Sequence, residues 1–406
     1  MNKVFSNRYE ESTIDTRREK RMTINSIILG LFLSVSMITK LITTVVAFDN
    51  NIIVFVGLLL IVSFFTNGGL RISKPFVCIN LLVVAWFGIS MGISMITNTV
   101  QSHAWTYMLS YVLYGVVGML FCSVPLHFEK VFKTISFVFI PYTAYLLFLH
   151  IPLMLKYGYL VESMDISYTL LHGVCAVLIC WKSFSKLFKC IFAILLAISV
   201  YYIFFLSSCR GAVLSLAVFV LILYMSQKKH KAFRVFLIFS IAIFLFLFWE
   251  DIFGILYQWF PDANWLNRIL YSADFSSGRD DIYRMAINLV DRNLLFGVGI
   301  GGFESYADGT YTHNLFLQMF CEMGLPLGLI VSAILSVWIV RSILKKDDSF
   351  ENKFQIFLIC QFIPRLLLSS VYWLNSFIWI YIFLRIMFFY TKKNSVEKTG
   401  EILQQK

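Results

Sequence analysis

The stretch Leu315–Val340 reads LFLQMFCEMGLPLGLIVSAILSVWIV and carries a single charged residue, Glu322. A run of about 20 predominantly apolar residues is long enough to cross the hydrocarbon core of a bilayer as a helix. Similar runs recur along the chain, which is 59% hydrophobic and 14% charged, whereas soluble proteins carry about 25% charged residues. The sequence therefore predicts an all-α polytopic membrane protein, with residues 1–406 forming one membrane domain.

Working outward from this stretch, we expect about twelve transmembrane helices, of which it is the tenth. The spans are expected near residues 22–46, 50–65, 76–96, 104–124, 133–153, 165–181, 188–206, 211–226, 233–249, 314–340, 353–370 and 373–390. The first apolar run is too long for the core of a signal peptide, so we expect it to remain as an uncleaved helix.

Lysine and arginine alternate between rich and poor connections along this series of spans. One rich connection contains Lys228, Lys229, Lys231 and Arg234. Because cytoplasmic loops are enriched in these residues, the pattern predicts that both termini are cytoplasmic. It also places a large loop, residues 250–312 between the ninth and tenth spans, outside the cytoplasm. This orientation signal accounts for the net charge of +11, so we expect no nucleic-acid partner.

The outward loop contains a predicted amphipathic helix over Asp280–Val290, where apolar residues recur at helical spacing. Ser276 or Ser277 would cap its start. Arg279 would then lie beside the free backbone N–H groups of the first turn, and the two together would bind an anion such as a phosphate. The alternative is that Arg279 only pairs with a neighbouring aspartate.

The same loop contains Gly297, Gly299 and Gly302 in the spacing GxGxxG. A dinucleotide site would require a preceding strand and a βαβ unit, and neither is expected in an outward loop of a helical membrane protein. The glycines are better explained by a tight turn or by close approach of two backbones.

Several polar residues lie at the outer ends of the expected spans. His313 lies at the boundary of the tenth span, on the same side of the membrane as Arg279. Arg210 lies between the seventh and eighth spans and Arg365 near the outer end of the eleventh; an arginine at such a depth either snorkels to the surface or faces a polar cavity. Glu322 would lie about 13 Å deeper than His313, where a carboxylate is costly unless it is paired.

Five short motifs occur in a recognisable order along the chain. They are Ser207–Gly211, Ser277-Gly278-Arg279, Gly297–Phe303, His313–Leu317 and Glu322-Met323-Gly324. Their order and spacing resemble the O-antigen ligase and polymerase family of bacterial envelope glycosyltransferases. The resemblance is sharpest over residues 191–340, and elsewhere it consists of the number of spans and the large outward loop.

The resemblance implies a fold similar to the GT-C class of membrane glycosyltransferases and a metal-independent reaction without a cofactor. The donor would be a glycan on undecaprenyl diphosphate at the outer face of the bacterial inner membrane. By motif, Arg210 and Arg279 would bind the diphosphate, and His313 would activate or position the acceptor hydroxyl. Further expected substrate-binding residues are Asn314, Arg284, Arg365 and Glu322.

Two activities occur in the family that the chain resembles. A polymerase joins lipid-linked repeat units into O-antigen or capsular polysaccharide, and a ligase transfers the finished glycan to the lipid A core. The compact end of the loop and its glycine-rich stretch are more similar to polymerases, which favours that activity; a chain-length regulator would then be a further partner. A lipid-linked glycan transporter is the alternative of another class, but it should have interrupted spans in two related halves, and no internal repeat is found.

Overall fold

The computed structural model describes residues 2–45, 51–97, 102–157, 163–207, 209–226, 249–261, 266, 279–345 and 347–404. Every regular element in these ranges is helical, which confirms the all-α prediction. The elements are α1 (Asn2–Leu33), α2 (Val35–Val45), α3 (Asn51–Asn67), α4 (Lys74–Thr97), α5 (Ser102–Ser110), η1 (Tyr111–Val116), α6 (Val117–Cys122), α7 (Phe128–Tyr145), η2 (Leu146–His150), α8 (Ile151–Tyr157), α9 (Ser163–Cys180), η3 (Trp181–Ser183), α10 (Lys186–Tyr201), η4 (Tyr202–Leu206), α11 (Arg210–Ser226), α13 (Trp249–Trp259), α15 (Arg279–Arg292), α16 (Gly302–Tyr306), α17 (Leu315–Leu344), α18 (Phe350–Leu368), η5 (Tyr372–Leu374) and α19 (Ser376–Gln404).

Six helical segments in the described part of the chain are long and apolar enough to cross a membrane, and a bent pair, Asp15–Leu33 with Val35–Thr44, makes a seventh. Three shorter apolar helices, Asn51–Asn67, Arg210–Met225 and Ser376–Thr391, accompany them. These segments fall where spans are expected and confirm a polytopic membrane protein. The expected ninth span, 233–249, lies outside the described residues except at its end, so the count of about twelve stays a prediction.

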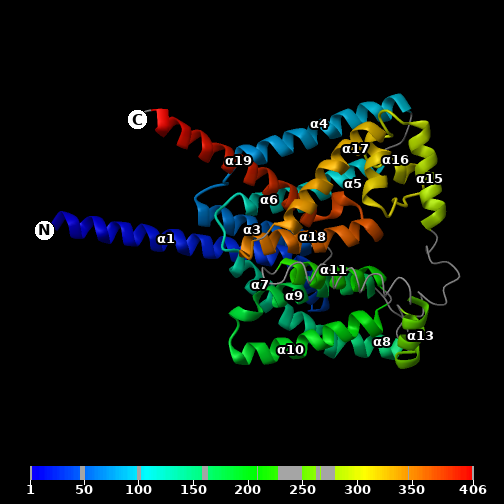
Figure 1. Ribbon diagram of the computed structural model, residues 1–406, viewed down its shortest axis with the longest axis horizontal. Helices are drawn as coiled ribbons and strands as arrows, with labels where there is room; N and C mark the ends of the chain where they lie inside the picture. Colours follow the sequence, from blue (N-terminus) through cyan, green and yellow to red (C-terminus); the bar gives the residue numbers. More distant parts are fainter. Residues whose placement is uncertain are drawn as a thin grey trace.

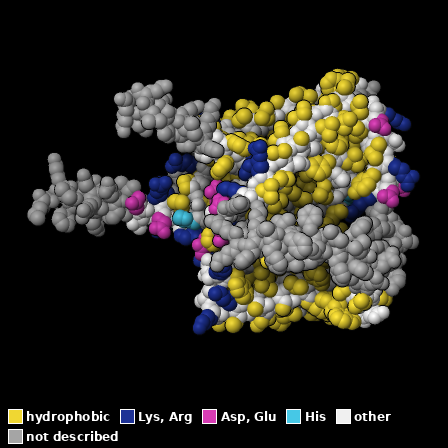
Figure 2. Space-filling view, viewed as in Figure 1, with side chains coloured by type: hydrophobic (Ala, Val, Ile, Leu, Met, Phe, Trp, Pro, Cys, Tyr) yellow, Lys and Arg dark blue, Asp and Glu magenta, His cyan; other side chains and the backbone are white. Residues whose placement is uncertain are grey.

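The long helices run side by side, and the helices of the large loop lie at one end of the bundle (Figure 1). α15 and α16 lie at this end, while α1 and α19 extend from the opposite end, where the two termini lie. Apolar side chains cover the middle of the visible face, with lysine and arginine gathered toward the end with the termini (Figure 2). On this face, charged side chains lie toward the two ends of the bundle, and apolar side chains lie between them (Figure 2).

The predicted loop helix is present as α15, which extends over Arg279–Arg292. Its buried residues Ala286, Leu289 and Val290 pack against Val298 and Phe303 in a small apolar core separate from that of the main bundle. α15 also packs along the outer part of α17. Packing of this apolar face, more than helix propensity, keeps such a short helix in place.

The glycine run docks against a break in α17. At Gly324 the backbone leaves the helical conformation, with φ 73° and ψ 170°. The turn of the loop supplies partners for the groups that the break exposes: Val298 N–H donates to the Cys321 carbonyl at 2.8 Å, and Gly299 N–H donates to the Glu322 carbonyl at 3.2 Å. In return, Leu325 N–H donates to the loop carbonyl of Leu294 at 2.8 Å.

Pro326 explains why this second set of partners is needed. In a continuous helix the Glu322 carbonyl would accept from residue 326, but proline has no N–H group. A carbonyl left without a partner at membrane depth would cost several kcal/mol (roughly). A Cβ atom at Gly297 would lie 2.5 Å from the Cys321 carbonyl oxygen, and one at Gly324 would lie 2.5 Å from that of Leu295. The expected close approach of two backbones at the glycine run is thus confirmed.

Substitution of Gly324 by alanine should destabilise the protein by at least about 1 kcal/mol, because a left-handed backbone alone costs this much for a residue with a Cβ and the added atom also meets Leu295. The matched control is Gly88→Ala in α4, where an added Cβ meets nothing within 4 Å and where alanine favours the helix. Thermal unfolding in detergent should give a lower midpoint for Gly324→Ala and an unchanged or raised one for Gly88→Ala. Equal midpoints for the two variants would contradict this account of the break.

Candidate functional site

His313 lies in the short connection between α16 and α17, in a left-handed conformation with φ 53°. Its ring packs on that of Tyr311, with centroids 4.1 Å apart and planes inclined by 39°. Burial lowers the pKa of His313, the positive charge of Arg279 lowers it further, and a hydrogen bond with the Leu368 backbone opposes both. The imidazole is half-buried and is favoured in its neutral form, which is the form that accepts a proton.

Arg279 begins α15, as predicted, and its charge acts on both His313 and Tyr311. Burial raises the pKa of Tyr311, while the charges of Arg365 and Arg279 lower it. Two arginines from helices far apart in the sequence therefore lie within electrostatic range of one tyrosine. The Ser277-Gly278 part of the motif, including both expected capping serines, lies outside the described residues.

Arg365 stands on α18 at the same end of the bundle. Its guanidinium forms an ion pair with Asp165 of α9 at 3.3 Å and lies 5.3 Å from the ring centroid of Tyr168. The Tyr168 hydroxyl is 3.0 Å from Ser369 Oγ, and Tyr311 Oη donates to the Ser369 carbonyl at 2.8 Å. Arg365 is thus connected through Tyr168 and Ser369 to the residues that pack against His313.

Arg210 begins α11, which packs closely against α18. A Cβ on the adjacent Gly211 would collide with the hydroxyl of Tyr168. The absence of a side chain at Gly211 therefore allows the start of α11 to approach the Tyr168–Arg365 pair. Four separate segments therefore meet at this site. The charges of Arg279 and Arg365 act on Tyr311 beside His313, and Arg210 begins the helix whose Gly211 contacts Tyr168.

Arg284 occupies a different part of the surface. It pairs with Asp281 at 3.3 Å, and the two side chains are 75% and 80% exposed. It lies five positions after Arg279, so the two arginines point about 140° apart around α15. The described contacts of Arg284 do not connect it with the His313 group, and its substrate-binding role stays a prediction.

Asn314 and Glu322 are engaged by the protein itself. Asn314 Oδ1 accepts from the backbone N–H groups of Phe316 and Leu317 and so caps the start of α17. Glu322 is fully buried; its carboxylate accepts hydrogen bonds from Tyr372 and from the indole of Trp373. Both residues therefore stabilise the fold through these contacts, and binding of substrate by either residue stays a prediction.

Sequence reasoning did not identify Tyr311, Tyr168, Asp165 or Ser369 as part of this group. Asp165 and Arg365 are separated by 200 positions, and no sequence motif contains both residues or predicts their contact. The one local signal was the position of Tyr311 two residues before His313. Among the described residues no cluster of three or more His, Cys, Asp or Glu side chains could hold a metal ion.

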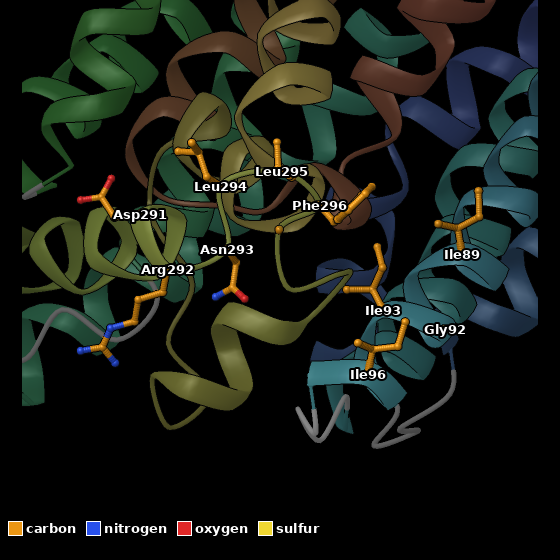
Figure 3. Close-up of a pocket in the computed structure, with 11 residues that line it drawn as sticks. Ile89, Gly92, Ile93, Ile96, Asp291, Arg292, Asn293, Leu294, Leu295 and Phe296 are labelled. Atoms are coloured by element: carbon orange, nitrogen blue, oxygen red, sulfur yellow. The ribbon is translucent and has the colours of Figure 1, made fainter.

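A groove of about 620 Å³ lies at the far end of α15 from Arg279 (Figure 3). Ile89, Ile93 and Ile96 of α4 line one side, and residues 294–296 line the other. Figure 3 shows the Arg292 side chain extending away from the isoleucines. In a membrane-spanning chain such an apolar lining is normal for a surface in contact with acyl chains.

Comparison with known proteins identifies a matching family model. Residues 191–332 match the family model described as O-antigen ligase, and no curated protein or solved structure matches the chain. The matched segment contains Arg210, Arg279 and His313, whereas Arg365 lies beyond it. The resemblance inferred from the motifs is thereby confirmed at the level of the family.

Replacing Arg279 by glutamine should raise the pKa of His313, because it removes one of the two causes that lower this pKa. In the unaltered protein the imidazole should stay neutral below its ordinary pKa of about 6.5 and become protonated as the pH falls further. The check is an NMR titration of ¹³C-labelled histidine in detergent, with His313→Gln used to assign the signal. An unchanged midpoint in Arg279→Gln would show that the arginine does not act on this ring.

Proposed function

We propose that this chain, whose residues 191–332 match the family model described as O-antigen ligase, is a glycosyltransferase that polymerises undecaprenyl-diphosphate-linked repeat units into O-antigen or capsular polysaccharide. The family and the apolar helices together indicate a multi-pass inner-membrane enzyme of glycan assembly. The observation that supports a glycosyltransferase site is the packing of Tyr311 directly on His313, with the charges of Arg279 and Arg365 acting on Tyr311. The preference for a polymerase rests on the similarity of the compact loop end and of the glycine-rich stretch to polymerases.

In the proposed reaction, an acceptor hydroxyl attacks the anomeric carbon of the donor sugar. The new glycosidic C–O bond forms while the bond from this carbon to the diphosphate oxygen breaks. His313 takes the hydroxyl proton, directly or after positioning the hydroxyl, and the electron pair of the broken bond leaves with the diphosphate. The neutral state of His313, favoured by burial and by Arg279, supports its role as the proton acceptor.

The arginines suit the leaving group. As the bond breaks, negative charge develops on the lipid diphosphate, and guanidinium groups contact phosphate oxygens through two parallel hydrogen bonds. Such preorganised donors in a partly dry site lower a barrier by about 3–4 kcal/mol each. Arg210 and Arg279 would make these contacts, with Arg365 as a further cation.

The orientation of the chain supports donor access from outside. α1 and α19 extend from the end of the bundle opposite to α15 and α16 (Figure 1). Both termini in the cytoplasm, as the charge pattern predicts, would put the His313 group at the outer face. Lipid-linked glycans presented on that face would then reach it without crossing the bilayer.

A ligase that transfers the glycan to the lipid A core is the second candidate, since the matching family model is described as O-antigen ligase and does not distinguish the two activities. Both activities use the same donor and the same leaving group, so the arginines and His313 would serve either. The difference lies in the acceptor: another lipid-linked repeat unit for a polymerase, and a core oligosaccharide for a ligase.

Removal of the site side chains should abolish glycan assembly while the protein stays in the membrane. We expect Arg279→Gln and His313→Gln to lower polymer formation by on the order of 100-fold or more. The matched control is Arg292→Gln, which removes the same charge from the other end of α15 and should retain activity. Gel analysis of the surface glycan, with protein quantified in membranes, gives the result; normal glycan in both site variants would contradict the proposal.

Deletion of the gene separates the two activities. A polymerase deletion should leave single repeat units on the core or the lipid carrier, because transfer continues without elongation. A ligase deletion should instead leave long chains on undecaprenyl diphosphate. Extracted lipid-linked glycans resolved by chain length distinguish these results, and long carrier-linked chains would overturn the polymerase assignment in favour of the ligase.

A further inference from the structure

His313 is held in a backbone conformation that residues with a side chain rarely adopt. Thr312, the residue before it, is hydrogen-bonded to Asn314, the residue after it, and we call this pair of residues around His313 the clasp. Asn314 N–H donates to Thr312 Oγ1 at 3.4 Å. The same oxygen lies 2.9 Å from the Asn314 carbonyl oxygen, but its single proton is donated to Gln318. Because one hydroxyl joins the two residues on either side of His313, it fixes the direction in which the imidazole leaves the backbone.

Gln318, in the first turn of α17, forms hydrogen bonds with Thr312 and so stabilises the clasp. Its Oε1 accepts from the Thr312 hydroxyl at 2.9 Å and from the Thr312 backbone N–H at 3.3 Å. Its Nε2 donates to Glu304 Oε1 at 2.8 Å and to Glu322 Oε1 at 2.7 Å. With two carboxyl groups beside the nitrogen, a flipped amide would place its oxygen against them, so the oxygen must face Thr312.

The two carboxyl groups are themselves anchored to several elements. Tyr107 of α5 donates to Glu304 at 2.8 Å, and Tyr372 and Trp373 of η5 donate to Glu322. Burial raises the pKa of the Glu304 carboxyl. Glu304 and Glu322 have no exposed surface, and Gln318 is 2% exposed, so these side chains offer no surface to a substrate in this arrangement.

A buried network of this kind is costly compared with an apolar core of the same volume. Although Glu304 Oε2 has no hydrogen-bond partner, hydrogen bonds from Tyr107, Tyr372 and Trp373 hold the two carboxyl groups in place. These bonds keep the Gln318 amide between the carboxyl groups in one orientation. The side chain of Gln318 connects the network to the His313 group through its contact with Thr312, and the Gln318 backbone N–H also donates to the Asn314 carbonyl at 2.9 Å.

We propose that Thr312 and Gln318 are positioning residues for His313, and that Glu304 and Glu322 keep Gln318 in the orientation that holds the clasp. This inference rests on the proposed function for its kinetic consequence. In this proposal the buried carboxyl groups of Glu304 and Glu322 orient Gln318 and do not contact the substrate.

The test compares Thr312→Val with Thr312→Ser in the full-length protein in lipid nanodiscs. Valine keeps the volume and removes the hydroxyl, whereas serine keeps the hydroxyl. With a synthetic lipid-linked repeat unit, we expect kcat of the valine variant to fall on the order of 100-fold with little change in KM, as for a misplaced catalytic group. The serine variant should retain most of kcat. Wild-type kcat in the valine variant, or equal losses in both, would overturn the proposal.

A measurement without substrate keeps this inference separate from the proposed function. The ring protons of His313 should carry a ring-current shift from Tyr311, whose ring centroid is 4.1 Å away. This shift should change in Thr312→Val and stay in Thr312→Ser. If the unaltered protein makes no polymer, the proposed function fails, but the NMR shift of His313 still tests the positioning role of Thr312. An unchanged His313 signal in the valine variant would contradict that positioning role.

Gln318→Met provides an independent variant if the valine protein does not fold. Methionine keeps the length of the side chain and removes both ends of the amide. Because Gln318 acts through Thr312, kcat of the double variant should be no lower than that of the worse single variant. Losses of kcat that multiply in the double variant would show that the two residues act separately and would overturn the proposed chain of contacts.

Discussion

The exchange of backbone hydrogen bonds between the glycine turn and the broken α17 is the interaction on which the site depends. Pro326 cannot donate, Gly324 leaves the helix, and the turn at Val298 and Gly299 supplies the missing donors. This contact is made of backbone groups, which tolerate little displacement. It fixes the loop that carries α15, and hence Arg279, relative to the helix whose first turn follows His313.

The sequence was sufficient to predict the elements but not their pairing. Apolar runs and the spacing around Ile282 predicted the spans and α15, because each depends on local periodicity. The sequence contains glycine motifs at Gly297 and Gly324, but it did not predict that the two glycines lie against each other. It gave no indication of the residue that pairs with Arg365. Asp165 lies 200 positions away, and such pairs are set by helix packing, which one sequence does not encode in a readable pattern.

Glu322 illustrates the same limit for a single residue. A lone acid within an apolar span predicts a functional or paired group, and the sequence could not distinguish a substrate contact from a structural one. Its partners Tyr372 and Trp373 come from a short turn some 50 positions away, and Gln318 is four positions before it. Only Gln318 could have been anticipated, because residues four apart share a helix face.

The ion pair of Arg365 with Asp165 is compatible with binding of an anion at the same guanidinium. The side chain of Asp165 is 64% exposed, and an exposed pair of this kind contributes at most about 1 kcal/mol. A diphosphate offers more charge and can accept two parallel hydrogen bonds from one guanidinium, so it would compete effectively with the carboxylate. Asp165 would then keep Arg365 extended over Tyr168 before an anion arrives, at a position from which its charge already acts on Tyr311.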